Sequence, residues 1–164
     1  MTAAWKEFFG FGKEKGYILG SPMDGEAVAL EQVDDPTFSE KILGDGIALI
    51  PSTGRVVAPV AGTVAIMFET GHAVSLVSEK GTEILIHIGL NTVNLKGKYF
   101  HPKVKANDKV KPGDLLLEFD LDQIIESGYD PISPVVICNS ETYSDITTYT
   151  GELKELDRLM VIKN

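Results

Sequence analysis

Two of the three histidines in this chain lie in strand-like runs, where their side chains could carry chemistry. His87 stands in TEILIHIGLN (82–91), in which isoleucine occupies every second position from residue 84 to residue 88. His72 stands in TGHAVSLVS (70–78), which also alternates. Imidazole has an ordinary pKa of about 6.5, so near neutral pH it can act as nucleophile, proton donor or metal ligand. These two histidines are the first candidates for a site.

The turn signal SEKG (78–81) between the two runs decides whether the imidazoles meet. With a two-residue loop, His72 faces His87 across an antiparallel hairpin, and the Cβ atoms of such a pair lie about 4.5–5.5 Å apart on one face. This is the pairing that we predict. If Gly81 instead closes a three-residue loop, the register moves by one residue, which without a bulge sends the rings to opposite faces.

Two adjacent imidazoles allow two kinds of site. A metal site needs three or four ligands, and Glu69 or Glu83 would have to supply the third, because no HExxH or His-x-His motif occurs. We predict no metal or other cofactor, and at most an adventitious zinc ion between His72 and His87. A phosphoryl-transfer site instead needs one nucleophilic nitrogen and a donor for the phosphate oxygens.

Neighbouring residues fit the phosphoryl site. Thr70, two residues before His72, could orient that ring, and a backbone carbonyl near Gly89 could take the proton of the other ring nitrogen of His87. His87 would then be the nucleophile and His72 the donor. The alternative is that both are ordinary half-buried strand histidines. The third histidine, His101, precedes a proline and is expected as an exposed surface residue.

Many short, β-branched runs separated by turn signals make up the rest of the chain, which predicts an all-β sandwich or barrel. Only residues 35–43 and 121–128 have a short helical pattern. The stretches SPMDGEAVAL (21–30) and APVAGTVAIM (58–67) share a Pro-x-x-Gly turn followed by an alternating strand, which suggests two similar halves.

Length and charge set further limits. A chain of 164 residues fits one domain, and its net charge of −9 argues against a nucleic-acid partner while suiting basic protein partners. Cys138 is the single cysteine, so no internal disulfide can form and a reducing cytoplasm is expected. We predict Cys138 as a small buried apolar residue. No apolar run reaches the roughly 18 residues that would span a membrane.

Residues 1–16 are predicted to be an N-terminal amphipathic segment and linker, followed by one domain over residues 17–164. Trp5, Phe8 and Phe9 would share one face of a helix. Such a helix over residues 1–12 could make weak contact with the inner face of the cell membrane and hold the protein there peripherally. The alternatives are that the segment packs back onto the domain or is disordered.

Six stretches of the chain resemble the glucose-type enzyme IIA of the bacterial phosphoenolpyruvate-dependent sugar phosphotransferase system. They are KILGDGIALIP (41–51), VAPVAGTV (57–64), FETGHAVSL (68–76), EILIHIGLNTVNLKG (83–97), VKPGDLLLEFD (110–120) and PVVICN (134–139). The resemblance implies an antiparallel β-sandwich or barrel-like fold with few short helices.

The resemblance also implies a role for each candidate residue. His87 matches the histidine phosphorylated on Nε2, His72 the second histidine that stabilises the phosphoryl group, and Thr70 the threonine bonded to that second histidine. Members of this family accept phosphate from the histidine-containing carrier HPr. They pass it to a cysteine on the enzyme IIB domain of a sugar transporter, which phosphorylates the sugar during uptake.

Binding of two different partners implies an apolar surface around the histidines. Four residues match the apolar surround of the family and two could form a negative rim toward a basic carrier: Phe38, Ile42, Phe68 and Val93, and Asp35 and Asp145. Core packing for the apolar residues, and solvated turn carboxylates for the acidic ones, are the alternatives.

Three other classes of function stay open at this point. The first is a regulator whose binding to metabolic proteins is switched by the phosphorylation state of His87. The second is a zinc hydrolase, whose ligand pattern the sequence lacks. The third is a biotin- or lipoyl-carrier module, suggested by VKPGDLL and VAPVAGTV, although Lys80 lacks the flanking pattern of a modified lysine.

Overall fold

The computed structural model describes residues 16–164, so the N-terminal helix expected over residues 1–12 lies outside the described part of the chain. The strands are β1 (Tyr17–Gly20), β2 (Gly25–Ala29), β3 (Asp45–Pro51), β4 (Arg55–Val57), β5 (Gly62–Met67), β6 (Ala73–Ser78), β7 (Glu83–His87), β8 (Phe100–Pro102), β9 (Lys109–Val110), β10 (Leu115–Phe119), β11 (Ser133–Ile137), β12 (Asp145–Thr148), β13 (Gly151–Leu153) and β14 (Arg158–Lys163). The helices are α2 (Pro36–Ser39) and α3 (Leu121–Glu126), with 3₁₀ turns η1 (Leu30–Gln32), η2 (Thr92–Leu95) and η3 (Ser140–Thr142).

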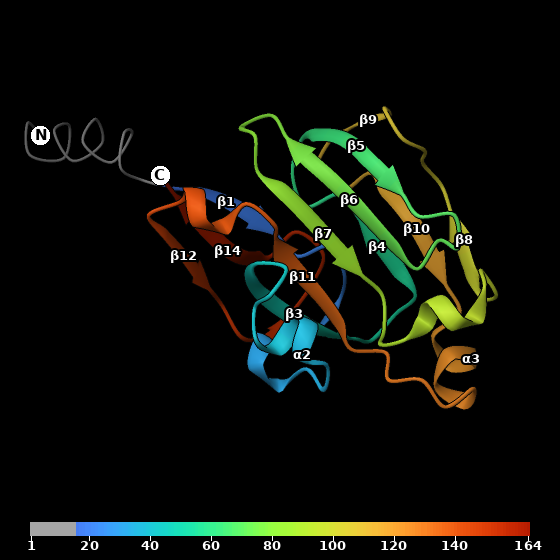
Figure 1. The fold of residues 1–164 in the computed structure, drawn as a ribbon. Coiled ribbons are helices and arrows are strands. Elements are labelled where there is room, and N and C mark those ends of the chain that lie inside the picture. The colour runs from blue at the N-terminus through green and yellow to red at the C-terminus, as the bar shows by residue number, and fades with distance from the viewer. Residues whose placement is uncertain (1–15) are drawn as a thin grey trace, which may run out of the picture.

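Antiparallel sheets build the domain, as predicted (Figure 1). The largest sheet has eight strands in the order β13-β2-β3-β11-β7-β6-β5-β9, and two three-stranded sheets have the orders β1-β14-β12 and β4-β10-β8. Every strand pair recorded in the described residues runs antiparallel. The layers therefore belong to the expected all-β class.

The eight-stranded sheet divides into two similar halves at the β11–β7 contact, with four strands on each side. Strands β2 and β5, which follow the two Pro-x-x-Gly turns, both lie second from an edge. The turns also contact each other, because the Val57 N–H donates to the Pro22 carbonyl at 2.7 Å and the Gly20 N–H donates to the Pro59 carbonyl at 3.2 Å. The repeat seen in the sequence thus corresponds to a repeat in space.

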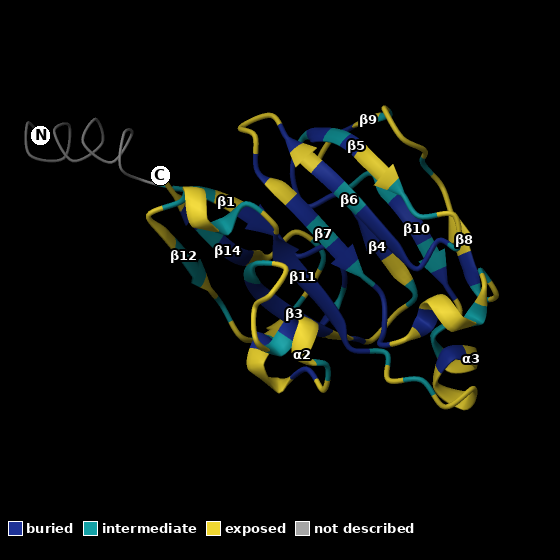
Figure 2. Cartoon of the chain, in the orientation of Figure 1, coloured by how far each residue is buried: buried dark blue, intermediate teal, exposed yellow. Residues whose placement is uncertain are grey.

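Strand alternation buries the isoleucines around His87. Ile84, Ile86 and Ile88 are completely buried, while His87 itself is half-buried. Burying each such side chain stabilises the fold by about 1.5–3 kcal/mol. Figure 2 shows the buried residues concentrated in the sheets and the exposed ones in loops and helix faces. The apolar alternation therefore holds β7 rigidly at the centre of the molecule.

The predicted β6–β7 register was wrong. Ala73, not His72, lies opposite His87, and Val74 lies opposite Ile86. The loop has three residues, 79–81, because Val77 lies opposite Glu83 and the Ser78 N–H donates to the Thr82 carbonyl at 2.9 Å. Gly81 reaches this geometry with a φ of +88°, in the left-handed region that favours glycine.

Both helical patterns form helices, but shorter than predicted. Helix α2 ends at Ser39, and Lys41 then adopts a φ of +58°, which no α-helix can continue. Helix α3 ends at Glu126, and Gly128 follows with a φ of +91°. No helix within residues 16–164 is long and apolar enough to cross a membrane.

Cys138 is exposed, so its prediction as a buried residue was wrong. The preceding residue, Ile137, ends β11 with its side chain completely buried. Every residue of β11 is buried, so both faces of this strand are covered, whereas Cys138 lies one residue beyond its end. The Cys138 N–H remains tied to the sheet through the Glu83 carbonyl at 2.8 Å.

Candidate active site

The two candidate histidines meet although the predicted register was wrong. Their ring centroids lie 5.0 Å apart and the ring planes cross at 82°. His72 precedes the first paired residue of β6 and follows Gly71, which has a φ of +72°. Strand alternation therefore does not fix the direction of its side chain. The Ile88 N–H donates to the His72 carbonyl at 2.7 Å, which holds the two segments together.

The ring of His87 is fixed by its own backbone. Its Nδ1 lies 2.9 Å from the Gly89 carbonyl, so Nδ1 must carry the proton and Nε2 is left with a free lone pair. This hydrogen bond was predicted from the sequence. Burial lowers the pKa of His87, an effect that the Gly89 carbonyl and the charge of Asp35 partly oppose. The imidazole is therefore neutral and nucleophilic near pH 7.

The ring of His72 is held by Thr70, whose hydroxyl forms a hydrogen bond with its Nδ1. This contact too was predicted, and it leaves Nε2 as the nitrogen without a partner among the hydrogen bonds of the described residues. Burial, and then the charge of a protonated His87, lower the pKa of His72 to about 4. Both rings of the pair are thus uncharged under ordinary conditions.

Two phenylalanines extend the pair into a row of four rings. The Phe38 ring lies 5.1 Å from the His87 ring, and the Phe68 ring packs edge-on at 5.4 Å from the His72 ring. Phe68 is half-buried. Phe38 is only 5 % exposed, which favours the core-packing alternative over an open apolar surface. It packs in a small core cluster and supports the His87 ring from the side.

Exposed aliphatic residues lie in the segments that follow α2 and the His87 strand. Ile42 is 67 % exposed and Val93 51 % exposed, which favours a surface role over core packing. Sequence analysis missed Leu43, which is also exposed. The signal for it was the apolar pair directly before the Gly-Asp-Gly turn (44–46).

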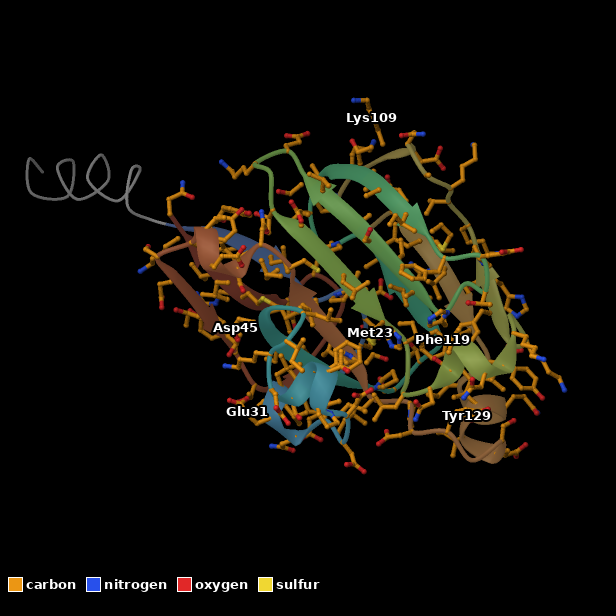
Figure 3. The ribbon with its side chains drawn as sticks, in the orientation of Figure 1. Met23, Glu31, Asp45, Lys109, Phe119 and Tyr129 are labelled. Atoms are coloured by element: carbon orange, nitrogen blue, oxygen red, sulfur yellow. The ribbon has the colours of Figure 1, made fainter. Side chains whose placement is uncertain are left out.

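The two predicted acidic residues lie in different places. Asp35 caps α2, accepting a hydrogen bond from the Thr37 N–H at 3.0 Å, and its charge acts on His87. Asp145 is exposed on β12 and lines a shallow pocket together with Asp45. Asp45 is labelled in Figure 3, beside α2. The charge of Asp35 thus acts on His87, whereas Asp145 contributes to the pKa shift of neither histidine.

Metal binding has little support here. Residues 16–164 contain no group of three or more His, Cys, Asp or Glu side chains that could hold a metal ion. The pair offers two ligands, fewer than a structural or catalytic zinc site needs. His101 is exposed, as predicted, and lies 3.5 Å from Asp120.

Two more polar residues near His87 were missed from the sequence. Thr92 and Ser133 are completely buried, and their hydroxyls bond to the backbone that follows His87. The only available signal was a small hydroxyl residue next to apolar neighbours, which many surface turns share.

Known proteins similar to this chain share one description. Residues 17–143 match the family described as phosphoenolpyruvate-dependent sugar phosphotransferase system, EIIA 1. The glucose-specific EIIA component of Buchnera aphidicola is 44 % identical over 146 residues, covering 89 % of this chain and 91 % of that protein. Glucose permease IIA from Mycoplasma capricolum has a similar structure, with a TM-score of 0.81 at 34 % identity, covering 89 % of this chain and 95 % of that one.

Longer relatives contain the same region as one part. The beta-glucoside-specific EIIBCA component of Dickeya chrysanthemi is 50 % identical over 135 residues, which cover 82 % of this chain. The chain spans 21 % of the length of that relative. The resemblance identified from sequence motifs is confirmed: the chain belongs to the EIIA 1 family of the phosphoenolpyruvate-dependent sugar phosphotransferase system.

Proposed function

We propose that this protein is a phosphohistidine carrier that accepts a phosphoryl group from HPr on Nε2 of His87. It then passes the group to a cysteine of an enzyme IIB domain of a sugar transporter. The observation that carries the proposal is the pair of rings with both Nδ1 atoms already engaged, which leaves two Nε2 atoms for chemistry. The fusion of similar EIIA regions to EIIB and EIIC in the beta-glucoside-specific relative supports the IIB partner.

In the first step, the Nε2 lone pair of His87 attacks phosphorus as the bond from phosphorus to the donor histidine breaks. The donor nitrogen keeps that electron pair, and the His87 ring becomes positively charged. The Gly89 carbonyl at Nδ1–H favours this charge, because a hydrogen bond to a charged donor is stronger than one to a neutral donor. Positioning and electrostatics therefore carry the step.

His72 acts as the donor toward the transferred group. With the Thr70 hydroxyl donating to its Nδ1, the proton of the neutral His72 ring resides on Nε2. From 5.0 Å between ring centroids, this N–H can reach a phosphoryl oxygen on the neighbouring ring and stabilise its negative charge. Thr70 thus sets the tautomer that His72 needs.

Partners would dock over the exposed aliphatic residues around the pair. Ile42 and Val93 offer apolar contact area, while Phe68 borders the ring of His72. Such a surface excludes water from the phosphoryl group during transfer, which also protects it from hydrolysis. The carrier works where HPr and the IIB domain meet, at the cytoplasmic side of the membrane.

The test is phosphorylation by phosphoenolpyruvate, enzyme I and HPr. We expect His87→Gln to abolish incorporation of acid-labile phosphate, since no nucleophilic nitrogen remains at that position. His101→Gln is the matched control, because His101 is an exposed histidine outside the pair, and it should label normally. Labelling of His87→Gln at the wild-type level would contradict the proposal.

The same assay extended with enzyme IIB separates the two histidines. His72→Gln should still accept phosphate from HPr but lose about tenfold or more in the rate of onward transfer, since the transition state loses a hydrogen-bond donor. The measurement is sugar phosphorylation in the reconstituted relay. Normal turnover in this variant would remove His72 from the mechanism.

A further inference from the structure

We infer that Thr92 and Ser133 are positioning residues, whose buried hydroxyls hold the peptide that orients the nucleophilic ring of His87. The inference rests on the proposed function, in which His87 is the nucleophile, and it names two further residues that act on that site. Among the hydrogen bonds of residues 16–164, neither hydroxyl is bonded to the ring itself. Both act through the backbone between Ile88 and Leu90.

In one peptide unit, both the carbonyl and the N–H are hydrogen-bonded to side-chain hydroxyls. In the Ile88–Gly89 peptide, the carbonyl accepts a hydrogen bond from the Thr92 hydroxyl, and the N–H donates to the Ser133 hydroxyl at 3.4 Å. Ser133 in turn donates to the Pro131 carbonyl at 2.9 Å, which fixes the direction of its lone pairs. The two hydroxyls therefore define the plane of this peptide.

The next peptide unit carries the group that contacts His87. In the Gly89–Leu90 peptide, the carbonyl accepts from His87 Nδ1 at 2.9 Å, and the N–H donates to the Asp130 carbonyl at 2.9 Å. All four polar groups of these two peptides are thus engaged. Since consecutive peptides share the Gly89 Cα, rotation of the first unit would swing the carbonyl of the second away from the ring.

Because both hydroxyls are buried, water cannot easily take over their hydrogen bonds. Thr92 and Ser133 are both completely buried, so a lost partner could not be replaced freely by bulk water. They also come from different parts of the chain, Thr92 from η2 and Ser133 from the start of β11. The loop after His87 is thereby anchored both to its own 3₁₀ turn and to the neighbouring central strand.

The consequence for chemistry lies in the tautomer of His87. A Gly89 carbonyl aimed at Nδ1 keeps the proton there and leaves the lone pair on Nε2. When this carbonyl turns away, the neutral ring can place its proton on Nε2, and that form cannot attack phosphorus. Loss of either hydroxyl should therefore lower the fraction of competent rings without changing the partner surface.

The experiment uses Thr92→Val, Thr92→Ser and Ser133→Ala in the full chain. Nitrogen-resolved NMR of His87 at pH 7.5 should show a smaller Nδ1–H tautomer population in Thr92→Val and Ser133→Ala. Their rate of phosphoryl uptake from HPr at saturation should fall about tenfold, with KM for HPr changed less than about twofold. Thr92→Ser keeps the hydroxyl, so it should restore the tautomer and most of the rate.

Matched controls lie elsewhere in the core. Ser21→Ala removes another completely buried hydroxyl, which donates to the Met23 carbonyl at 2.7 Å. Thr82→Val removes the buried hydroxyl bonded to Tyr143 at 2.8 Å. Both should cost stability but leave the tautomer and uptake rate of His87 unchanged.

Wild-type tautomer and rate in folded Thr92→Val and Ser133→Ala would overturn the inference, as would equal losses in the two controls. A Thr92→Ser variant as impaired as Thr92→Val would do the same, since it would show that keeping the hydroxyl does not keep the ring competent. If one variant does not fold, the other position decides. A wild-type chain that takes no phosphate from HPr would instead refute the proposed function, while the NMR result would still test the two hydroxyls.

Discussion

The burial of His72 affects both the chemistry of its ring and the stability of the fold. It is 5 % exposed, and its burial keeps the ring neutral, with a pKa of about 4. A neutral ring with one N–H is what a donor to phosphate requires, because its tautomer can be set by Thr70. The same burial means that protonation of this residue works against the folded state.

We therefore predict that the free energy of unfolding falls as pH decreases from about 6.5 to 4. In this pH range His72 of the unfolded chain, with an ordinary pKa of about 6.5, is protonated, whereas His72 of the folded protein stays neutral. The contribution of this residue is about 2–3 kcal/mol, fully present above pH 6.5 and lost as pH falls toward 4.

Urea denaturation at pH 7, 5.5 and 4 measures this effect. His72→Gln has no group that titrates there, so its free energy of unfolding should fall less steeply than that of the wild type. Parallel curves for the two proteins would show that His72 does not carry the pH dependence.

At the scale of the element, the two turns that flank β7 differ in how tightly neighbouring atoms pack around their glycine. Gly81 and Gly89 both have positive φ, at +88° and +75°. A Cβ at Gly81 would meet no atom within 4 Å, whereas a Cβ at Gly89 would lie 2.6 Å from Thr92 Cγ2 and 3.0 Å from the Asp130 carbonyl oxygen. The two glycines thus have similar backbone conformations, but only Gly81 has room for a side chain.

Gly81→Ala should lower the free energy of unfolding by about 1–2 kcal/mol, the cost of a left-handed alanine. Gly89→Ala should lower it by about 2–4 kcal/mol, since the methyl group also clashes with the segment that holds His87. Only Gly89→Ala should slow phosphate uptake. Chemical denaturation and the HPr assay measure both effects, and equal losses from the two substitutions would argue against close packing at Gly89.

The whole molecule is acidic, with a net charge of −9. Long-range attraction then steers a basic partner toward it, and salt weakens this attraction, since the screening length shortens from about 30 Å at 0.01 M to about 3 Å at 1 M. Asp35 is the carboxylate whose charge acts on His87, so it should contribute to this steering at the site itself.

We predict that the second-order rate of phosphoryl transfer from HPr falls about tenfold or more between 0.01 M and 0.5 M salt. Asp35→Asn should weaken this dependence while preserving the cap of α2, because asparagine is also a good N-cap residue. Asp122→Asn, an exposed change on α3, is the control. A rate independent of salt would exclude electrostatic steering.

Contacts close in sequence were predictable. Thr70 bonds to the ring two residues later, and His87 bonds to the carbonyl two residues later, as expected from spacing alone. The alternating isoleucines likewise predicted the buried face of β7. Such features depend on backbone geometry over a few residues, which the order of amino acids sets directly.

By itself, then, the sequence determined the all-β class, the repeat and the family, and it singled out the two histidines whose rings meet in the structure. Only the tertiary structure decided that His72 meets His87 from outside the strand ladder, that Phe38 is buried against the His87 ring, and that Ser133 reaches the Gly89 peptide 44 positions away in sequence. These contacts depend on loop length and on the packing of distant strands. A change of one residue in a hairpin loop shifts the whole register, so local patterns cannot fix them.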